Sequence, residues 1–493
     1  MSQGFLGFQY EVEKKTGGMT SLAGLPLYIE YGNIMGMAGS LRDRLGGKNE
    51  IWTPDKVIMS LVMLNLAGGD CVDDLATLNA DDGLCRIMSE LQGYGLPRKQ
   101  RRAARYSSGR FTGSFPSPST VFRTLIRFHD HTQDSLREEG KAFIPESSDL
   151  LKSLFGVTKD FVASVQKRCA VSTATLDMDA TLIETSKRDA LYSYKGYKAY
   201  QPLNTYWAEQ ELIIHSEFRD GNVPAGFEQL RVFKEALDCL PEGVEQVFLR
   251  SDSAGYQQNL LKYCAEGLNE RFGRIEFAIG ADVTPEFRKA VREVPESDWI
   301  SLGEFQQYAE VCFVPNWMAK KKYGPTYRYI AIRECLKQQL LPGMQDQLEF
   351  PFQTMETDGM MYKLTGLITN RTIPGAELIK WYRLRCGKSE QAHSIMKEDL
   401  AGGKLPSKFF GVNAAWWHIM LLSLNLNSSM KRLVLGGPWI KQRLKSIRFR
   451  LINLSGRVAR HARSLIIRIS ACNPVNQLLI EARARMLELY QFG

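Results

Sequence analysis

The sequence predicts an α/β protein of several domains, in which helices cover a mixed sheet that carries a β-rich insertion. Three observations predict this class. A chain of 493 residues is too long for a single core. Its first part, residues 17–165, has the pattern of helices, and from residue 166 strand and helix patterns alternate. With 44% hydrophobic and 10% aromatic residues, we expect a globular protein.

The N-terminal region, residues 1–165, carries the start and stop signals of helices. The segment TPDKVIMSLVMLNLAGG, residues 53–69, has Pro at an early helical position and Gly at its end. The segment SPSTVFRTLIRFHDH, residues 117–131, begins with the Ser and Thr residues that cap helices. These signals predict a helical N-terminal domain.

Residues 166–282 predict the first part of the α/β domain. Three strand patterns are followed by a helix at 226–240, a strand at 246–252, a second helix and a strand in IEFAIGAD. Strands and helices that alternate in this way favour a mixed sheet with helices packed on it.

Residues 283–360 interrupt this alternation. The segments YRYIAIRE and YKLTGLIT have strand patterns between turn-rich segments, so we expect a β-rich insertion and leave open whether its last strand joins the main sheet. Residues 361–428 then complete the α/β domain with a helix at 375–400. The last region, 429–493, is basic, and its segments KSIRFRLINL and RSLIIRIS predict a small strand-rich element.

Positive charge is concentrated in two places. The net charge is +9, yet residues 401–480 contain thirteen Lys and Arg residues and no Asp or Glu. A second basic cluster lies in PRKQRRAARYSSGR, residues 97–110. An acid-free segment of this length favours a polyanionic partner, most often nucleic acid. The residues expected to contact DNA are Arg98, Lys99, Arg101, Arg102, Arg105, Arg448, Arg450, Arg457 and Arg460.

The segment TLDMDAT, residues 175–181, places Asp177 and Asp179 in a strand pattern. Side chains alternate along a strand, so both carboxylates lie on one face, where they repel each other unless a cation is near. The alternative is a solvated edge strand with a polar face. Six histidines and scattered cysteines argue against zinc, so a bound metal would be Mg²⁺ or Mn²⁺ held by oxygen ligands.

Two further carboxylates complete a candidate cluster with Asp179. Asp252 ends the strand in FLRSDSAGY, and Glu390 lies on the helix that follows the insertion. Carboxylates at strand ends and on a neighbouring helix can converge in the fold. Such a cluster can bind two metal ions that act together on a phosphodiester. Asp252 could instead cap a turn, and Glu390 could lie on an ordinary solvated face.

Several segments together resemble the DDE transposases of bacterial insertion sequences, in the branch with a Tyr-Arg-Glu-Lys signature. The matching motifs are LDMDAT, RSDSAGY and YRLRCGKSEQAHSIMKEDLAGGKLPSKFFGVNAAWW. LNLAGGDCVDDLATLNADDGL and FPSPSTVFRTLIRF are also similar, so the resemblance covers most of the chain. It implies a ribonuclease-H-like sheet with a β insertion. It also implies that Asp179, Asp252 and Glu390 are catalytic, supported by Tyr382, Arg385 and Lys397.

Two details of the signature stay open. The family usually has three residues between the signature Arg and Glu, whereas four separate Arg385 from Glu390. On a regular helix Arg383, Glu390 and Lys397 share a face, so either Arg383 takes the role or the helix is irregular. The first carboxylate could be Asp177, although the Asp-x-Thr context favours Asp179.

The resemblance implies a cut-and-paste DNA transposase with a two-metal site of Mg²⁺ or Mn²⁺. Its partners would be double-stranded DNA, as inverted-repeat ends and target, and a second copy in a homodimer. Some members of the branch release the element through a DNA hairpin. The rivals are a structure-selective nuclease of the same fold and an inactive DNA-binding derivative. With no signal peptide or membrane span apparent, we expect a bacterial cytoplasmic protein associated with the nucleoid.

Other residues of the sequence have an ordinary explanation. His393 could contact phosphate but is expected to be a satisfied helix histidine. The tyrosines of LYSYKGYKAYQPLNTYW, residues 191–207, could stack on unpaired bases beside Lys195 and Lys198, although packing is the favoured role.

Overall fold

A computed structural model describes residues 17–47, 50–92, 114–319, 327–336, 352–357, 359–461 and 464–491. The chain forms two compact units, each assembled from separate segments. The sheet unit consists of Asp130–Ser147 and Thr158–Ser394, and the helical unit of Met1–His129, Ser148–Val157 and Ile395–Gly493. The boundaries expected at residues 165 and 428 lie inside helices α8 (Asp149–Arg168) and α14 (Phe410–Met430).

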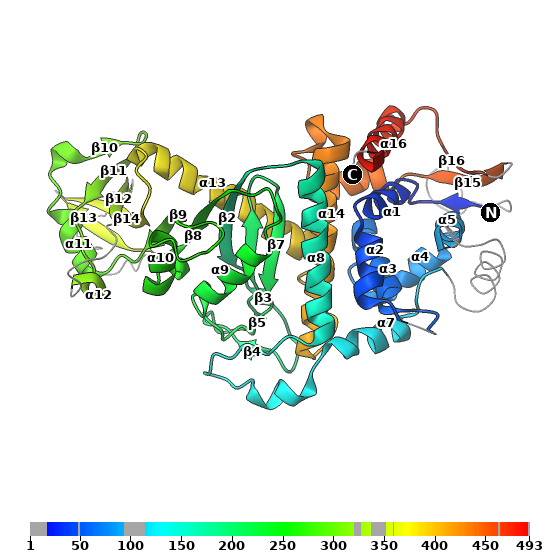
Figure 1. The fold of residues 1–493 in the computed structure, drawn as a ribbon, viewed down its shortest axis with the longest axis horizontal. Coiled ribbons are helices and arrows are strands. Elements are labelled where there is room, and N and C mark those ends of the chain that lie inside the picture. The colour runs from blue at the N-terminus through cyan, green and yellow to red at the C-terminus, as the bar shows by residue number, and fades with distance from the viewer. Residues whose placement is uncertain are drawn as a thin grey trace, which may run out of the picture. The chain divides into compact units, whose positions relative to one another are not determined.

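The sheet unit is built on a mixed sheet of ten strands (Figure 1). Its order is β10-β11-β12-β14-β9-β8-β2-β6-β7, and β13 pairs with β14 outside this path. Among the strand pairs in the described part of this sheet, only β2–β8 and β8–β9 are parallel. The strands are β2 (Thr173–Ala180), β6 (Leu203–Trp207), β7 (Leu212–Glu217), β8 (Gln246–Ser251), β9 (Glu276–Ala281), β10 (Ile300–Ser301), β11 (Gln306–Val311), β12 (Arg328–Cys335), β13 (Thr354–Thr357) and β14 (Met360–Thr369).

The order of elements in the first part of this sheet is the predicted one. Strands β2, β6 and β7 are followed by α9 (Gln229–Asp238), β8, α10 (Gln258–Ala265) and β9. The question left open for the insertion is also answered, because β14 pairs with β9 and returns the chain to the main sheet. Strands β10 to β13 extend the same sheet beyond β14 and do not form a second one. The mixed α/β class predicted from the sequence is confirmed.

Helices pack on both faces of the sheet. Register pairs place Met178, Thr205 and His215 in one row of β2, β6 and β7. On that face His215 Nε2 lies 3.2 Å from Glu235 of α9. Helix α13 (Gly375–Ser394) packs on β2, β8, β9 and β11 on the opposite face of the sheet (Figure 1). On that face Arg250 of β8 donates a hydrogen bond to the Trp381 carbonyl of α13. Strand β2 is therefore buried on both faces, and the edge-strand alternative for TLDMDAT is wrong.

A small three-stranded sheet is formed by the chain between β2 and β6. Its order is β3-β5-β4, with β3 (Ile183–Glu184), β4 (Leu191–Tyr192) and β5 (Lys198–Tyr200). Because β3 begins three residues after β2 ends, this sheet follows directly in the chain from the end of β2 that carries Asp179.

The helical unit confirms the caps predicted for its helices. Helix α3 (Pro54–Ala67) has Pro at its first position and ends at Gly68, whose φ of 109° few other residues adopt. Ser117 accepts a hydrogen bond from the Thr120 amide at the start of α7 (Pro118–Leu125). The other helices are α1 (Leu25–Ile34), α2 (Met37–Leu45), α4 (Leu75–Ala80), α5 (Asp82–Gln92), α15 (Leu444–Ile447) and α16 (Asn476–Gln491).

Helix α14 is the core of the helical unit. All of its residues from Phe410 to Met430 are buried, and the helix packs against α1, α3 and α7. A helix that is apolar on every side needs such a complete covering. Among the described residues, we find no helix whose length and apolar character would let it cross a membrane.

The strand pattern read in KSIRFRLINL is wrong, because this segment is helical. It forms α15 and a π-helical turn, Arg448–Ile452. The buried residues are Leu444, Ile447, Leu451 and Ile452, a helical spacing, whereas Phe449 is 81% exposed. The second segment does form a strand, β16 (Ser464–Ile469), which pairs with β15 (Gly456–His461). Strand β1 (Met19–Thr20) completes this sheet from the far end of the chain.

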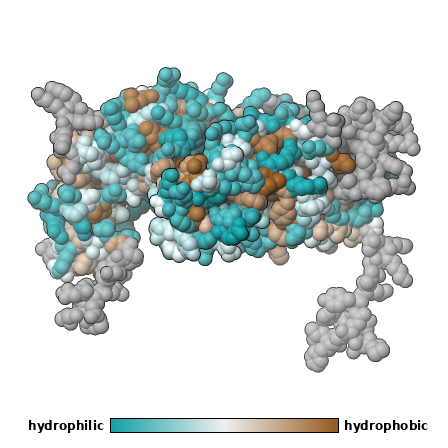
Figure 2. Space-filling model, turned by 90° about the horizontal axis from the view of Figure 1, so that it is seen from below, coloured by the Kyte–Doolittle hydropathy of each residue, from teal (hydrophilic) through white to brown (hydrophobic). Residues whose placement is uncertain are grey.

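Hydrophilic side chains dominate the face of the molecule drawn in Figure 2, with hydrophobic ones in scattered groups. Scattered apolar residues are normal on a protein surface.

Candidate active site

Asp179 and Asp252 lie at the carboxyl ends of two adjacent parallel strands. The register pairs Asp177 of β2 with Arg250 of β8 and Met178 with Ser251. The next pair along this register is Asp179 and Asp252. Neighbouring strands lie about 4.8 Å apart, so the sheet itself holds these two carboxylates side by side.

The loop after β8 fixes the position of Asp252. This residue begins a 3₁₀ turn, Ser253–Gly255, and its Oδ1 accepts a hydrogen bond of 3.0 Å from the Ala254 amide. The turn-cap role considered from the sequence is therefore present. It uses one carboxylate oxygen, and the other oxygen remains for a ligand.

Gly280 of β9 provides the space that this loop occupies. A Cβ atom at Gly280 would lie 2.9 Å from the Ser253 nitrogen and 3.4 Å from the Tyr382 hydroxyl. Any larger residue would push the loop away from the strand end. Gly280 is therefore required for the position of Asp252.

Asp177, considered as an alternative metal ligand, is part of a buried ion pair instead. Arg250 donates to both of its oxygens, at 2.6 and 2.8 Å, and also to the Trp381 carbonyl at 2.6 Å. Burial raises the pKa of Asp177, and the Arg250 guanidinium opposes this rise. We consider Asp177 ionised, because a neutral carboxyl would leave the buried Arg250 charge without a counter-charge. Both carboxylate oxygens of Asp177 are therefore already hydrogen-bonded to Arg250, which argues against Asp177 as a metal ligand.

Helix α13 brings Tyr382 and Arg385 to the two strand ends. The Tyr382 hydroxyl donates to the Ser251 carbonyl at 3.2 Å, and Arg385 Nη1 lies 3.5 Å from Asp179 Oδ2. The Arg385 guanidinium also lies over the Tyr382 ring, 5.7 Å from its centroid. Arg383 is exposed on another side of the helix. Of the two arginines left open by the sequence, Arg385 is the one beside the candidate site.

Glu390 lies further along α13 and is exposed. Its negative charge nevertheless acts on Asp179. In the part of the chain that the structure describes, the oxygens of Asp179, Asp252 and Glu390 do not all lie within 4.8 Å of one another. Lys397, the last signature residue, lies in a π-helical turn, Ile395–Asp399, which belongs to the helical unit. The helix is thus irregular, but after Glu390 and not between Arg385 and Glu390.

The electrostatics of the site favour a bound cation. Burial raises the pKa of Asp179, the Arg385 guanidinium opposes this, and the negative charges of Asp252 and Glu390 raise it further, to about 6. Repulsion between carboxylates is relieved when a divalent ion lies among them. The donor set consists of oxygens, which suits Mg²⁺ or Mn²⁺.

Three more polar residues form a chain of contacts that begins at Asp179, and of these only His393 was considered from the sequence, as a possible phosphate contact. His393 Nδ1 lies 3.8 Å from Asp179 Oδ2, and its Nε2 lies 3.0 Å from Asn204 Nδ2. Ser216 donates to Asn204 Oδ1 at 2.6 Å. Asn is depleted in strands, so Asn204 within the buried strand β6 could have signalled such a role.

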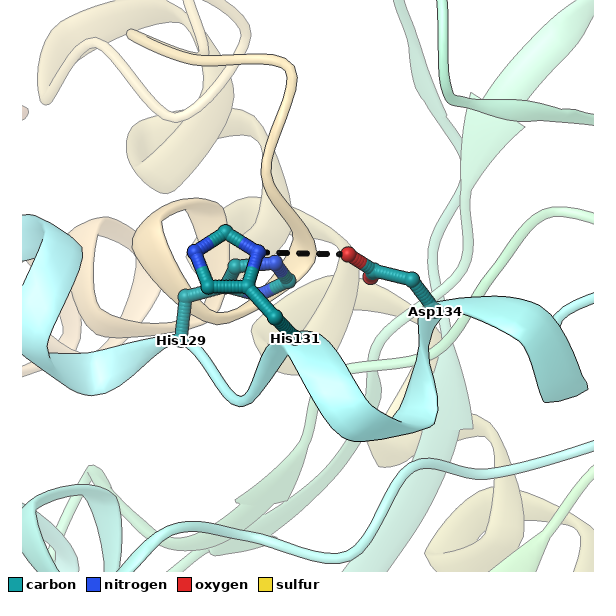
Figure 3. A group of neighbouring side chains, drawn as sticks. All are labelled: His129, His131 and Asp134. Carbon is teal, nitrogen blue, oxygen red and sulfur yellow. Dashed lines mark ion pairs between the residues drawn. The ribbon is translucent and has the colours of Figure 1, made fainter.

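His131 gives a contrasting example of a histidine near a carboxylate. It lies 3.5 Å from Asp134 in the 3₁₀ helix His131–Leu136 (Figure 3), and both side chains are exposed. An exposed pair three residues apart has an ordinary structural explanation and stabilises little.

The basic residues expected to contact DNA differ in their surroundings. Arg450, Arg457 and Arg460 are exposed. Arg448 instead donates to the carbonyls of three residues of the helical unit, so it does not project as a phosphate contact. Those carbonyls belong to Asn65, Leu66 and Asp399. The residues expected in the N-terminal cluster, Arg98, Lys99, Arg101, Arg102 and Arg105, lie outside the described residues.

The acid-free segment also finds acidic partners from elsewhere in the helical unit. Arg443 and Lys445 lie 2.9 and 3.4 Å from Asp399, and Arg460 pairs with Glu90. Arg457 of β15 lies directly opposite Arg468 of β16. Like charges directly opposite each other tend to destabilise a strand pair.

The five tyrosines between residues 191 and 207 differ in their exposure, and Tyr197 is partly buried. Tyr200 and Tyr206 are buried, as the packing interpretation predicts. Tyr192 and Tyr194 are 52% and 75% exposed, so packing does not account for them.

Comparison with known proteins gives the family of this chain. The sequence model of the family described as transposase DDE domain group 1 matches residues 7–491. A solved cryo-electron microscopy structure, the piggyBac transposase synaptic complex with hairpin DNA, aligns with a TM-score of 0.43. The alignment has 10% identity and covers 95% of this chain and 80% of that chain. No curated protein matches significantly.

Because the family model spans nearly the whole chain, this protein belongs to that family of DDE transposases. It is a DNA transposase of the DDE type, and enzymes of this family generally use a divalent metal.

Proposed function

We propose that this transposase moves DNA by cut-and-paste. It would cleave at the inverted-repeat ends of its element and join the freed 3′-hydroxyls to target DNA. The observation that supports this most is the Asp179 and Asp252 pair at adjacent strand ends, with Arg385 of α13 beside it. Phosphoryl transfer needs little from a protein beyond positioning and charge stabilisation.

Asp179, Asp252 and Glu390 would hold Mg²⁺ or Mn²⁺, in a two-metal site. When bound, such ions activate the attacking oxygen and stabilise the leaving oxygen of a phosphoryl transfer. The fit rests on the oxygen donors and on the pKa of Asp179, which burial raises and the charges of Asp252 and Glu390 raise further. Because Glu390 is exposed and is not grouped with the two aspartates, its side chain would have to move toward them to share a metal.

The remaining residues of the site would position the carboxylates. The Tyr382 hydroxyl ties α13 to the strand that carries Asp252, and Arg385 holds one oxygen of Asp179. The Arg250–Asp177 pair lies two residues earlier in the same two strands. It would keep β2 and β8 in register below the site.

DNA binding would use exposed cations and aromatic rings. Arg450, Arg457 and Arg460 are suited to phosphate, since they are exposed on the helical unit. Tyr192 and Tyr194, near Lys198 and Lys195, could stack on unpaired bases at a cleaved end. Joining two ends requires two active sites, so we propose a homodimer on DNA.

The test uses the full-length protein with DNA from the borders of its element and a supercoiled target plasmid. We expect nicking at the inverted repeats and joining to the plasmid with Mg²⁺ or Mn²⁺, and inhibition by Ca²⁺, whose looser coordination positions oxygens poorly. Asp252→Asn should bind DNA and not cut it, because it removes a metal ligand with little change in shape.

Each rival function predicts a different result. Cleavage without joining would identify a structure-selective nuclease. Specific DNA binding without cleavage in any metal would identify an inactive derivative. A covalently closed DNA end among the products would show release through a hairpin.

A further inference from the structure

His393 lies between the first catalytic carboxylate and a polar row of the sheet. It is 6% exposed, with Asp179 on one side of its ring and Asn204 on the other. We propose that His393 is a positioning residue, which orients Asp179 so that a defined oxygen of this carboxylate faces the metal. This inference rests on the proposed metal-dependent function.

The supporting residues come from three neighbouring strands at one level of the sheet. The register pairs Asp179 of β2 with Asn204 of β6, and Asn204 with Ser216 of β7. Asn204 and Ser216 are both almost completely buried. Buried amides and hydroxyls are costly unless they are hydrogen-bonded, so this row has a defined arrangement.

The hydrogen bonds of this row indicate which ring nitrogen of His393 carries the proton. The Ser216 hydroxyl donates to Asn204 Oδ1, so the Asn204 amide nitrogen is the group that faces His393. This nitrogen is a donor, and His393 Nε2 must accept from it. In a neutral imidazole the proton is then on Nδ1, the nitrogen that faces Asp179.

The two side-chain donors at Asp179 face the same oxygen, and the backbone amide of Ala180 also hydrogen-bonds to this carboxylate. Arg385 Nη1 is 3.5 Å and His393 Nδ1 is 3.8 Å from Asp179 Oδ2. Oδ1, the other oxygen of this carboxylate, would then be the one that faces a cation. The distance from His393 to Asp179 is longer than a hydrogen bond, and we expect it to shorten once a metal fixes the carboxylate, because catalytic hydrogen bonds are often long without ligand.

The test measures metal binding directly as well as activity. Binding of Mn²⁺ to the full-length protein is followed by electron paramagnetic resonance, and nicking of border DNA is followed as Mg²⁺ is varied. Replacing a residue that orients a metal ligand typically costs about 10- to 100-fold in metal affinity or activity. We expect His393→Ala to weaken Mn²⁺ binding by this factor and to raise the Mg²⁺ concentration for half-maximal nicking in parallel.

Conservative and coupled variants separate positioning from folding. His393→Gln keeps an N–H donor and should recover most of the metal affinity. Asn204→Ala should weaken Mn²⁺ binding, and the double variant with His393→Ala should be no worse than His393→Ala alone, because both residues act through the same hydrogen-bonded chain. His461→Ala, at an exposed histidine of the helical unit, should bind Mn²⁺ as the wild type does.

Two results would overturn the inference. One is wild-type Mn²⁺ affinity in folded His393→Ala. The other is a His393→Gln variant that binds Mn²⁺ no better than His393→Ala. If His393→Ala does not fold, Asn204→Ala decides, and wild-type Mn²⁺ affinity in that variant overturns the inference. A wild-type protein that binds Mn²⁺ but never cuts DNA would instead contradict the proposed function and leave the role of His393 in place.

Discussion

Replacing Asp179 by Asn should stabilise the metal-free protein even though it removes a proposed metal ligand. In the folded protein the pKa of Asp179 is raised from 3.8 to about 6, mainly by burial and with a contribution from the charges of Asp252 and Glu390. The folded state thus holds this proton more tightly than the unfolded state. Stability is therefore lost as the pH rises from about 4 to about 6, and the full cost applies above that range.

The size of the effect follows from the shift. About two pKa units at about 1.36 kcal/mol per unit correspond to about 3 kcal/mol. The side chain of Asp179 is only 16% exposed, so solvent screens this cost little. Asn has nearly the same shape and no charge. We expect Asp179→Asn to raise the free energy of unfolding at pH 8 in EDTA by up to about 3 kcal/mol, and the gain to shrink toward pH 4.

Denaturant unfolding of the full-length protein, followed by fluorescence at pH 5 and pH 8, measures this difference. Saturating Mn²⁺ should reverse the order, because metal binding stabilises the wild type and not the variant. Asp177→Asn is the matched control two residues earlier in the same strand. It leaves Arg250 buried without a counter-charge and should destabilise by about 3–5 kcal/mol.

The reasoning is refuted if Asp179→Asn is less stable than the wild type at pH 8 in EDTA. An equal gain at pH 5 and pH 8 would also refute it, since the effect would then not come from ionisation of Asp179.

Three more predictions concern the helix α13, the Asp252 loop and the basic surface. Glu390→Gln should bind border DNA normally and fail to nick it, whereas Glu398→Gln, which lies near Arg443 in the helical unit, should nick at the wild-type rate; the reverse result would shift the signature along the helix. Gly280→Ala should slow cleavage by at least about tenfold, because its Cβ displaces the backbone beside Asp252, while Gly387→Ala, whose Cβ meets nothing, should be active; equal rates would contradict the close packing. Removing three exposed arginines should flatten the slope of log affinity against log salt by about 0.9 for each phosphate that is no longer neutralised, and an unchanged slope would exclude them from the interface. The three replacements, made together in one variant, are Arg450→Ala, Arg457→Ala and Arg460→Ala.

The sequence by itself determined the local structure and the class of chemistry. Caps and periodicity predicted α3 and α7, because these signals act between residues a few positions apart. The order of strands and helices from β2 to β9 followed from hydrophobic patterns for the same reason. The motifs around Asp179 and Asp252 pointed to the DDE transposases, and the match of the family model confirms that membership.

Interactions between distant residues were decided by the tertiary structure alone. Asp177 and Asp179 look alike in sequence, yet Arg250, 73 residues away from Asp177, pairs with one of them and leaves the other for the site. The choice of Arg385 over Arg383 depends on how α13 rests on the sheet.

Charge and exposure were likewise decided by the tertiary structure. Arg443 lies in a segment without acidic residues, so the sequence did not predict that it has an acidic partner. The fold brings Asp399 to it. Phe449 is exposed in the folded protein, so the segment that looked like a strand in the sequence is buried with helical spacing instead. In each case the deciding term is a pairing or burial free energy between segments far apart in sequence, which no local pattern contains.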